Sequence, residues 1–352
     1  MSPSPIPQSA FPDRIDTEDA LDDLLTRPSP KLIENISSLE GPLLVLGAAG
    51  KMGPTLVRLA RRAADAAGHS MEIIAVSRFS GVEKRHRMEK HGIRTISCDL
   101  LDRAAVSQLP DARNIIYLVG LKFGTQQNPA ITWAVNTLVP THVSERYNQS
   151  RIVALSTGNV YPLVHVSTGG AVETDPLTPL GEYPNAAVAR ERLFEYHSIK
   201  NATRMVVLRL NYAVELRYGV LVDTAQRVWA NEPVDVTTGY FNCIWQGDAN
   251  ESILRSIDLA ATPSAKFNLT GLATLSVRDL IRRFGEIMGR RTQIVGHEAD
   301  TTLLSNSRSL WSKLGEPATP LDSVVEWTAH WVMGAKPTLG KPTHFEVRDG
   351  TF

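Results

Sequence analysis

Cysteine is scarce in this chain, with only Cys98 and Cys243 among 352 residues. Two cysteines are too few for a disulfide framework or a cysteine-rich zinc site. Charge of neither sign prevails, because 37 Lys and Arg residues stand against 37 Asp and Glu residues. This balance excludes a basic field that would attract nucleic acid, and it excludes an acidic tail. We therefore expect no nucleic-acid partner.

Long apolar runs and targeting signals are also missing. No stretch reaches the roughly 20 apolar residues that a membrane-spanning helix needs. Residues 1–8 are rich in Ser and Pro rather than charged and then apolar, unlike a signal peptide. We expect a cytoplasmic protein with no membrane partner. No cluster of His, Asp and Glu has metal-ligand spacing and no Gly-x-Ser-x-Gly elbow is present, so neither a metal site nor acyl transfer is indicated.

What the chain does contain is a glycine-rich turn between two apolar strands. The strands are residues 43–46 and 73–76, and the turn GAAGKMG holds Gly47, Gly50 and Gly53 before a helix. Lacking a Cβ, Gly47 allows the tight turn, Gly50 lets backbone approach a pyrophosphate, and Gly53 lets helix and strand pack closely. The phosphates would bind free N–H groups at the start of the helix. This order of elements predicts one half of a dinucleotide-binding fold.

The end of the second strand indicates which dinucleotide binds. An NAD site usually places an acidic residue there for the ribose hydroxyls, whereas the 2′-phosphate of NADP needs cations. This chain has Ser77 and Arg78 at that point, with Lys51 of the glycine turn as a second candidate cation. NADP is therefore the favoured cofactor. NAD is the alternative if Arg78 only stacks on the adenine or points into solvent.

Strands and helices alternate after this unit. Further strands are expected at residues 92–98, 114–119, 151–156 and 205–210, and helices at 129–147 and 183–198. Such alternation predicts an α/β fold with a Rossmann-type doubly wound parallel sheet, whose ligands bind at the carboxyl ends of the strands. The last third of the chain predicts a smaller C-terminal α/β lobe that covers the substrate. The helices expected in this third lie at residues 248–260, 277–288 and 321–333, and the expected strands include 267–269 and 293–295.

The chain therefore divides into four expected parts. They are an N-terminal extension (1–40), the NAD(P)-binding domain (41–210, with 244–262 returning to it), the substrate-binding lobe (211–243 and 263–335) and a tail (336–352). The extension should start with about ten disordered residues, followed by two short helices capped by Thr17 and Ser29. The tail holds Phe345 and Phe352, and we expect it to clasp either the body or a partner subunit.

Several short motifs follow one another along the chain. They are GAAGKMG, Asp99-Leu100, Asn136, Ser156-Thr157 with Val160-Tyr161, Tyr183 with Glu191, Arg209, and the aromatic-x-x-Asp sequence Trp245-Gln246-Gly247-Asp248. In this order, residues 41–335 resemble the extended short-chain dehydrogenase/reductase family, the group of NAD(P)-dependent sugar epimerases and dehydratases. With the glycine turn, the resemblance implies a cofactor site of Gly47, Gly50, Lys51, Met52, Gly53, Ser77, Arg78, Asp99, Leu100, Val119, Gly120 and Tyr183.

The resemblance also implies a set of catalytic residues. In that family a Tyr exchanges a proton with the substrate oxygen, a Ser or Thr hydrogen-bonds the same oxygen, and a Lys four residues after the Tyr lowers the pKa of the phenol. Thr157 and Tyr183 match the first two roles, but Ala187 stands at the Lys position. A free phenol has a pKa of about 10, so without the cation a step that needs phenolate would slow by roughly 10²–10³. Reduction of a carbonyl uses the neutral phenol and would suffer less.

Two substitutes for the missing Lys are conceivable. Arg190, seven residues after Tyr183, lies on roughly the same helical face, so its long side chain can reach back. Tyr196 and Lys200 repeat the family's Tyr-to-Lys spacing, but they lie at the far end of the expected helix. We interpret this second pair as a coincidence, and replacement of Tyr196 by Phe should leave turnover intact.

The region before Trp245 bears on the substrate. Enzymes of nucleotide-diphosphate sugars usually carry an Arg there, because a diphosphate needs charged partners. Residues 237–245 contain no cation. This disfavours a nucleotide sugar and favours a small sugar, sugar acid or polyol. The expected substrate-binding residues are Asn159, Asn211, Tyr212 and Trp245, with a core position as the alternative for Tyr212 and Trp245.

The expected function is thus an NADP-dependent oxidoreductase or epimerase of a small carbohydrate-like substrate. The alternative is an NADP-binding sensor or interaction protein that has lost its proton-transfer residues, as Ala187 indicates. Retention of both Thr157 and Tyr183 favours catalysis. The resemblance further implies a homodimer, formed through the long helices around Asn136 and Tyr183.

Overall fold

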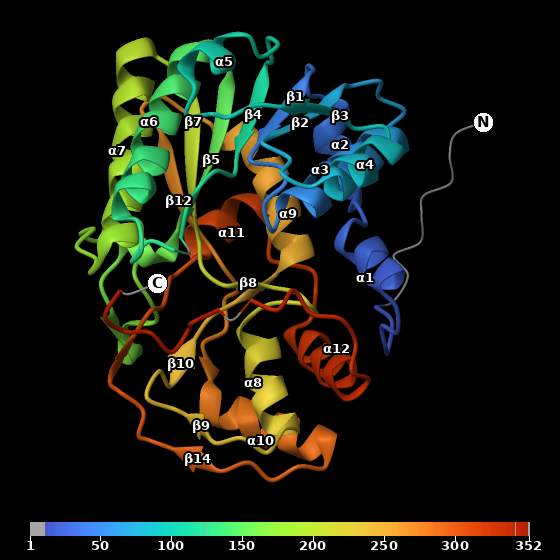
Figure 1. Cartoon of the computed structure of the whole chain (residues 1–352), viewed down its shortest axis with the longest axis vertical. Coiled ribbons are helices and arrows are strands. Elements are labelled where there is room, and N and C mark those ends of the chain that lie inside the picture. The colour runs from blue at the N-terminus through green and yellow to red at the C-terminus, as the bar shows by residue number, and fades with distance from the viewer. Residues whose placement is uncertain (1–10, 123, 342, 351–352) are drawn as a thin grey trace.

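The centre of the molecule is a parallel sheet (Figure 1). The computed structural model describes residues 11–122, 124–341 and 343–350, so the predicted disorder of residues 1–10 and the position of Phe352 lie outside it. Within the described residues the sheet has seven strands in the order β12-β7-β5-β4-β1-β2-β3, all parallel. The strands are β1 (Leu43–Leu46), β2 (Ile73–Ser77), β3 (Arg94–Ser97), β4 (Asn114–Tyr117), β5 (Arg151–Thr157), β7 (Met205–Leu210) and β12 (Ala265–Leu269). The predicted Rossmann-type doubly wound sheet is confirmed.

Alternate side chains of the sheet enter two separate cores. In β1, Leu43 and Val45 pack into one core, whereas Leu44 and Leu46 pack into the other. The first face is covered by α2 (Pro30–Ser37), α3 (Gly53–Ala66), α4 (Val82–Lys90), α9 (Gln246–Arg255) and α11 (Arg308–Leu314). The second is covered by α5 (Arg103–Ser107), α6 (Pro129–Arg146) and α7 (Glu182–Asn201). Because helices bury both faces, β1 is apolar throughout.

The strand order reverses between β1 and β4. From β1 the chain passes through β2 to β3 at one edge of the sheet, and it then returns to β4 on the other side of β1. At such a switch point the carboxyl ends of the strands leave a crevice for a ligand. Gly47 follows β1 and Gly120 lies just beyond β4. The glycine turn and the segment where the nicotinamide is expected to bind therefore follow neighbouring strands.

The N-terminal extension contains both predicted helices. Thr17 Oγ1 accepts from the N–H of Ala20 at the start of α1 (Glu18–Leu25), at 3.1 Å. Ser29 Oγ likewise accepts from the N–H of Leu32 in α2, at 3.1 Å. Leu21 of α1 packs in the core of the smaller lobe, whereas α2 packs on the sheet. The extension therefore joins the two bodies of the molecule.

The smaller lobe lies below the sheet in Figure 1. Its helices are α8 (Val220–Trp229), α10 (Val277–Met288) and α12 (Leu321–Met333), and the predictions for α10 and α12 are confirmed at both ends. Its strands are β9 (Val234–Asp235), β10 (Tyr240–Phe241), β13 (Leu275–Ser276) and β14 (Ile294–Val295). They form the pairs β9 with β14 and β10 with β13.

The predicted start of the second lobe segment at residue 263 is wrong. Strand β12 pairs in parallel with β7 and so belongs to the central sheet. Helix α11 also lies outside the lobe, because Leu310 and Trp311 pack in a core of the sheet. A short alternating strand such as β12, with the sequence AKFNL, has the same periodicity in either sheet, so the sequence does not reveal its partner.

The remaining elements are short. They are β6 (Val164–His165), β8 (Ala213–Val214), β11 (Ile244–Trp245), β15 (Thr301–Thr302) and the 3₁₀ turns η1 (Gly158–Val160), η2 (Val166–Thr168) and η3 (Ser256–Leu259). Strand β8 pairs with β11, and β6 pairs with β15. Among the described residues, no helix has both the length and the apolar character needed to cross a membrane.

The tail runs over both bodies. Phe345 is buried in the core of the lobe, and Thr343 Oγ1 donates to Asp223 at 2.5 Å. A Cβ on Gly181 would lie 2.2 Å from the carbonyl oxygen of Gly350, so the tail backbone contacts the start of α7. Of the two predicted alternatives, contact with the body is confirmed.

Candidate active site

The glycine turn has the shape of a phosphate-binding loop. Gly47 has a φ of +80°, which favours glycine. A Cβ on Gly53 would lie 2.1 Å from the carbonyl oxygen of Ala48, and one on Gly50 would lie 3.2 Å from the carbonyl oxygen of Gly47. Helix α3 therefore begins in direct contact with the turn. Met52 gives it no side-chain cap, which leaves the N–H groups of its first turn for a ligand, and a pyrophosphate fits there.

The two residues predicted to select the dinucleotide follow β2 at the edge of this crevice. Ser77 is half-buried and Arg78 is exposed. A second cation lies near the glycine turn, because Lys84 of α4 donates to the carbonyl oxygen of Ala49 at 3.1 Å. Sequence reasoning did not single out Lys84, although it lies six residues after Arg78 on the following helix.

Lys51 does not act as a second cation beside Arg78, so that prediction is wrong. Its Nζ donates to the carbonyl oxygen of Ala213 at 2.7 Å and lies 3.7 Å from the centroid of the Tyr218 ring. The side chain thus leaves the glycine turn toward the lobe. The spacing of the motif gives the position of a residue along the loop but not the direction of its side chain.

Asp99 and Leu100 follow β3, where the adenine was expected. Asp99 is exposed, and its Oδ1 accepts from the N–H of Leu101 at 3.0 Å. Leu100 is buried in the core on the second face of the sheet. Contact of the Asp99 carboxylate with an adenine amino group stays a prediction.

A buried guanidinium lies at the end of the crevice where the nicotinamide is expected to bind. Arg190 Nη1 donates to the carbonyl oxygen of Val119 at 3.1 Å and to Asn136 Oδ1 at 2.9 Å. A Cβ on Gly120 would lie 2.6 Å from the same nitrogen. Arg190 is 3% exposed. Ala187 is fully buried among apolar side chains. Arg190 therefore supplies a cation at the end of β4 where the family has its Lys.

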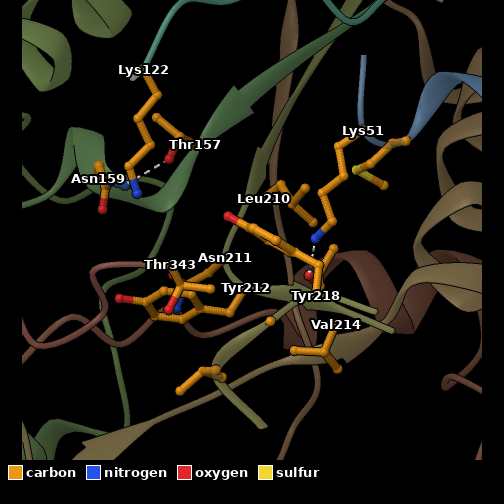
Figure 2. A pocket seen from close by; sticks show the side chains of 14 residues that line it. Lys51, Lys122, Thr157, Asn159, Leu210, Asn211, Tyr212, Val214, Tyr218 and Thr343 are labelled. Atoms are coloured by element: carbon orange, nitrogen blue, oxygen red, sulfur yellow. Dashed lines mark hydrogen bonds between the residues drawn. The ribbon is translucent and has the colours of Figure 1, made fainter. Parts of the chain in front are cut away.

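A pocket of about 150 Å³ opens beside this crevice (Figure 2). It is lined by Lys51, Met52, Lys122, Thr157, Asn159, Leu210, Asn211, Tyr212, Ala213, Val214, Tyr218, Gly219, Val220 and Thr343. These residues come from the glycine turn, the segment after β4, the ends of β5 and β7, strand β8, the start of α8 and the tail. Of the four predicted substrate-binding residues, Asn159, Asn211 and Tyr212 meet here.

The two predicted catalytic residues are placed differently. Thr157 lines the pocket, and its Oγ1 accepts from the N–H of Asn159 at 3.2 Å. Tyr183 lies in the first turn of α7 and is 8% exposed, but it is not a lining residue. Its phenol is close enough to contribute to the raised pKa of Tyr218. A shared substrate oxygen between Thr157 and Tyr183 stays a prediction.

Trp245 belongs to the core of the lobe, so its assignment to substrate binding is wrong. It is 4% exposed, and its ring meets Trp327 at a centroid distance of 5.7 Å. The core alternative therefore holds for Trp245. Tyr212 combines both roles, because it lines the pocket while its ring packs edge-on against Phe241, with centroids 6.3 Å apart.

Three pocket residues with polar side chains were not predicted, namely Lys122, Tyr218 and Thr343. Burial lowers the pKa of Lys122 to about 8. Burial, with smaller effects from Asp223 and Tyr183, raises the pKa of Tyr218 to about 12. Lys122 lies two residues beyond Gly120, which is the one sequence signal that could have identified it.

Other family motifs form a buried network behind the pocket. Arg209 and Glu191 are 2% and 1% exposed at their side chains and form an ion pair at 2.8 Å. Ser156 Oγ donates to Glu191 at 2.5 Å, and Arg209 Nη1 donates to the hydroxyl of Tyr161 at 2.6 Å. The network joins β5, α7 and β7, and it fixes the strand end that carries Thr157.

Comparison with known proteins defines the class. Residues 43–214 match the model of the NAD dependent epimerase/dehydratase family. This part of the chain, which holds the glycine turn, Thr157 and Tyr183, belongs to that family. The protein is accordingly an enzyme of the type that uses a nicotinamide dinucleotide.

Several solved structures share the fold. UDP-glucose 4-epimerase of Thermus thermophilus, in complex with NAD, is 20% identical with a TM-score of 0.66, over 83% of this chain and 99% of that one. dTDP-glucose 4,6-dehydratase of Bacillus anthracis, also with NAD, is 13% identical with a TM-score of 0.68, over 82% and 95%. UDP-glucuronic acid 4-epimerase of Bacillus cereus is 16% identical with a TM-score of 0.66, over 82% and 96%. A comparison with curated protein sequences found no match.

Proposed function

We propose that this protein is an NADP-dependent epimerase or oxidoreductase of a small carbohydrate-like substrate. The pocket at the ends of β5 and β7 supports this proposal most directly. Its volume of about 150 Å³ is below the roughly 300–1,000 Å³ of typical sites for larger ligands, and so it suits a single sugar-sized molecule. Thr157, Asn159 and Asn211 present hydroxyl and amide groups along its wall, which suit sugar hydroxyls.

The preference for NADP rests on charge at the adenosine end. Arg78 follows β2 at the position where an NAD site would carry an acidic residue. Lys84 adds a second cation through its contact with the carbonyl of Ala49. Two cations suit the 2′-phosphate, whose charge needs such partners. When bound, the dinucleotide would supply hydride transfer.

The proposed roles of the side chains follow from their positions. Thr157 would donate its hydroxyl proton to the substrate oxygen, and Tyr183 would exchange a proton with the same oxygen. Because Ala187 offers no amine that would stabilise a phenolate, the site should favour steps in which Tyr183 gives up a proton to a carbonyl oxygen.

A nucleotide sugar is the competing substrate, because the similar epimerase and dehydratase structures are those of enzymes named for such compounds. Two observations support a smaller molecule. Residues 237–245 carry no cation for a diphosphate. In the same segment, Asn242 is engaged internally, because it accepts from Asn211 Nδ2 at 2.7 Å and donates to the carbonyl of Ser305 at 2.6 Å.

The test is a screen of sugars, sugar acids and polyols that follows NADPH absorbance, together with NMR analysis of sugar isomers. NMR is needed because an epimerase that regenerates its cofactor gives no net absorbance change. Tyr183→Phe should lower turnover by about 10² or more, because it removes the exchangeable proton. Tyr196→Phe is the matched control and should turn over normally, since Tyr196 is 54% exposed on the same helix. Cofactor binding without turnover of any compound would favour the sensor alternative.

We also propose a homodimer formed through α6 and α7. The two helices pack together on the second face of the sheet. Leu138 of α6 is 49% exposed, and Ile199 of α7 is 60% exposed, so an apolar surface is available for a second copy. Light scattering coupled to gel filtration should give twice the mass of 38.6 kDa, and a monomer mass at micromolar concentration would contradict the dimer.

A further inference from the structure

Two lysine side chains enter the pocket from different elements. Lys51 comes from the glycine turn, and Lys122 comes from the segment that follows β4. Figure 2 shows Lys122 beside Thr157 and Asn159, with Lys51 reaching down on the opposite side of the view. Neither position was expected to bind substrate. Both side chains nevertheless line the same small cavity as Thr157.

No carboxylate balances these cations on the pocket wall, among the residues that the structure describes. Glu215 and Asp223 are the acidic groups that act on Lys51, and both have other partners. Glu215 accepts from Arg217 Nε at 3.1 Å, and Asp223 accepts from Thr343 at 2.5 Å. The pocket is therefore positive where a substrate would lie.

The protonation of the two amines follows from their surroundings. Burial of the amine, opposed by Glu215 and Asp223 and reinforced by Lys122, lowers the pKa of Lys51 to about 7. Lys51 as a residue is exposed, because its stem lines the open pocket, but its Nζ is turned into protein against Ala213 and Tyr218. Burial alone lowers the pKa of Lys122 to about 8. An anion placed between the amines would favour their charged forms.

We propose that the substrate is a sugar that carries one anionic group, a carboxylate or a phosphate, and that Lys51 and Lys122 bind this group. An ammonium is a compact point charge that suits either anion. Lys51 uses one of its three N–H donors for Ala213 and has two for a ligand. Thr157 and Asn159 lie next to Lys122 and would hold neighbouring sugar hydroxyls. The inference rests on the proposed function and narrows its substrate class.

Calorimetric titration of the full chain saturated with NADP tests the inference. The probes are D-glucuronate, D-glucose 6-phosphate and uncharged D-glucose. At least one anionic probe should bind tenfold or more tightly than glucose. Tighter binding of glucuronate would identify the anionic group of the substrate as a carboxylate. Tighter binding of glucose 6-phosphate would identify it as a phosphate. If neither anionic probe binds more tightly than glucose, the inference is wrong.

Substitutions assign the effect to the two amines. Lys51→Met and Lys122→Met should each weaken binding of the preferred anionic probe by tenfold or more, and should weaken it more than they weaken binding of glucose. Lys313→Met is the matched control, because Lys313 is an exposed lysine of α11 outside the pocket. Normal binding of the anion by both pocket variants would overturn the inference.

The pH dependence provides an independent readout. Lys51 faces Glu215, Asp223, Tyr218 and Lys122, and the two amines are the groups among these that lose charge between about pH 6.5 and 9. Anion affinity should therefore be full at pH 6.5 and fall by tenfold or more toward pH 9. An affinity independent of pH over this range would contradict amine binding. Loss of NADP binding would instead count against the proposed function, so the two failures are distinguishable.

Discussion

At the scale of single residues, the position where the family has its lysine is a buried apolar site in this protein. Ala187 is fully buried beside Val160 and Tyr161, where an ammonium would be costly to desolvate. The positive charge instead comes from Arg190, whose Nη1 joins the carbonyl of Val119 and the side chain of Asn136. The cation thus reaches the end of β4 from almost one helical turn further along α7.

We expect Arg190 to act as a positioning residue for the end of β4. Arg190→Met should lower kcat/KM about tenfold, because it leaves the carbonyl oxygen of Val119 and the side chain of Asn136 without the donor that they share. Arg190→Lys should restore part of the activity. The measurement is kcat and KM, determined separately with the substrate found by the screen.

Arg192→Met is the control on the same helix, since the Arg192 side chain is 59% exposed. It should give the wild-type kcat and KM. If Arg190→Met lowers kcat/KM only in proportion to the loss of folded protein, Arg190 has only a structural role.

At the scale of elements, the buried pair of Glu191 and Arg209 fixes α7 against the two strands that frame the pocket. Arg209 Nε and Nη2 both donate to Glu191, at 2.8–3.1 Å. Ser156 of β5 also donates to Glu191. Removing one charge from a buried pair leaves the other without compensation, which is more damaging than the loss of an exposed pair.

Glu191→Gln should therefore lower the free energy of unfolding by about 3–5 kcal/mol. The exposed pair of Arg192 and Glu195, on the same helix, offers the matched control. Arg192→Gln should lower the free energy of unfolding by less than about 1 kcal/mol. Urea denaturation followed by circular dichroism measures both, and equal effects of the two substitutions would contradict this role for the buried pair.

Elements with local signals were predictable from the sequence, and elements defined by distant contacts were not. The caps Thr17, Ser29 and Ser276 lie within three residues of the N–H groups that they accept from, so α1, α2 and α10 could be placed. Strand β12 was assigned to the lobe because its pairing with β7 joins segments about 60 residues apart.

The same distinction applies to the candidate site. Thr157, Asn159 and Asn211 follow strands whose carboxyl ends must meet in a parallel sheet, and their meeting in the pocket could be predicted. Tyr218 and Thr343 reach the pocket from the loop before α8 and from the tail, and no periodicity encodes the packing of these segments. The direction of Lys51 and the burial of Trp245 likewise depend on tertiary contacts.

At the scale of the whole molecule, the pocket lies where three parts of the chain meet. The sheet domain contributes Thr157, the lobe contributes Val220 at the start of α8, and the tail contributes Thr343. The tail also reaches the start of α7, close to Tyr183. The glycine turn stands at this junction, because its Lys51 contacts the lobe through the carbonyl of Ala213.

Binding of a pyridine dinucleotide to the glycine turn underlies all these roles, and calorimetric titration of the purified protein with NADP and NAD tests it. NADP should bind, about tenfold or more tightly than NAD. Gly53→Ala should weaken binding tenfold or more, because its Cβ would meet Ala48 at 2.1 Å, whereas Gly81→Ala, with open space around its Cβ, should bind as wild type. Absence of binding of either dinucleotide to the folded protein would contradict a cofactor site on this turn.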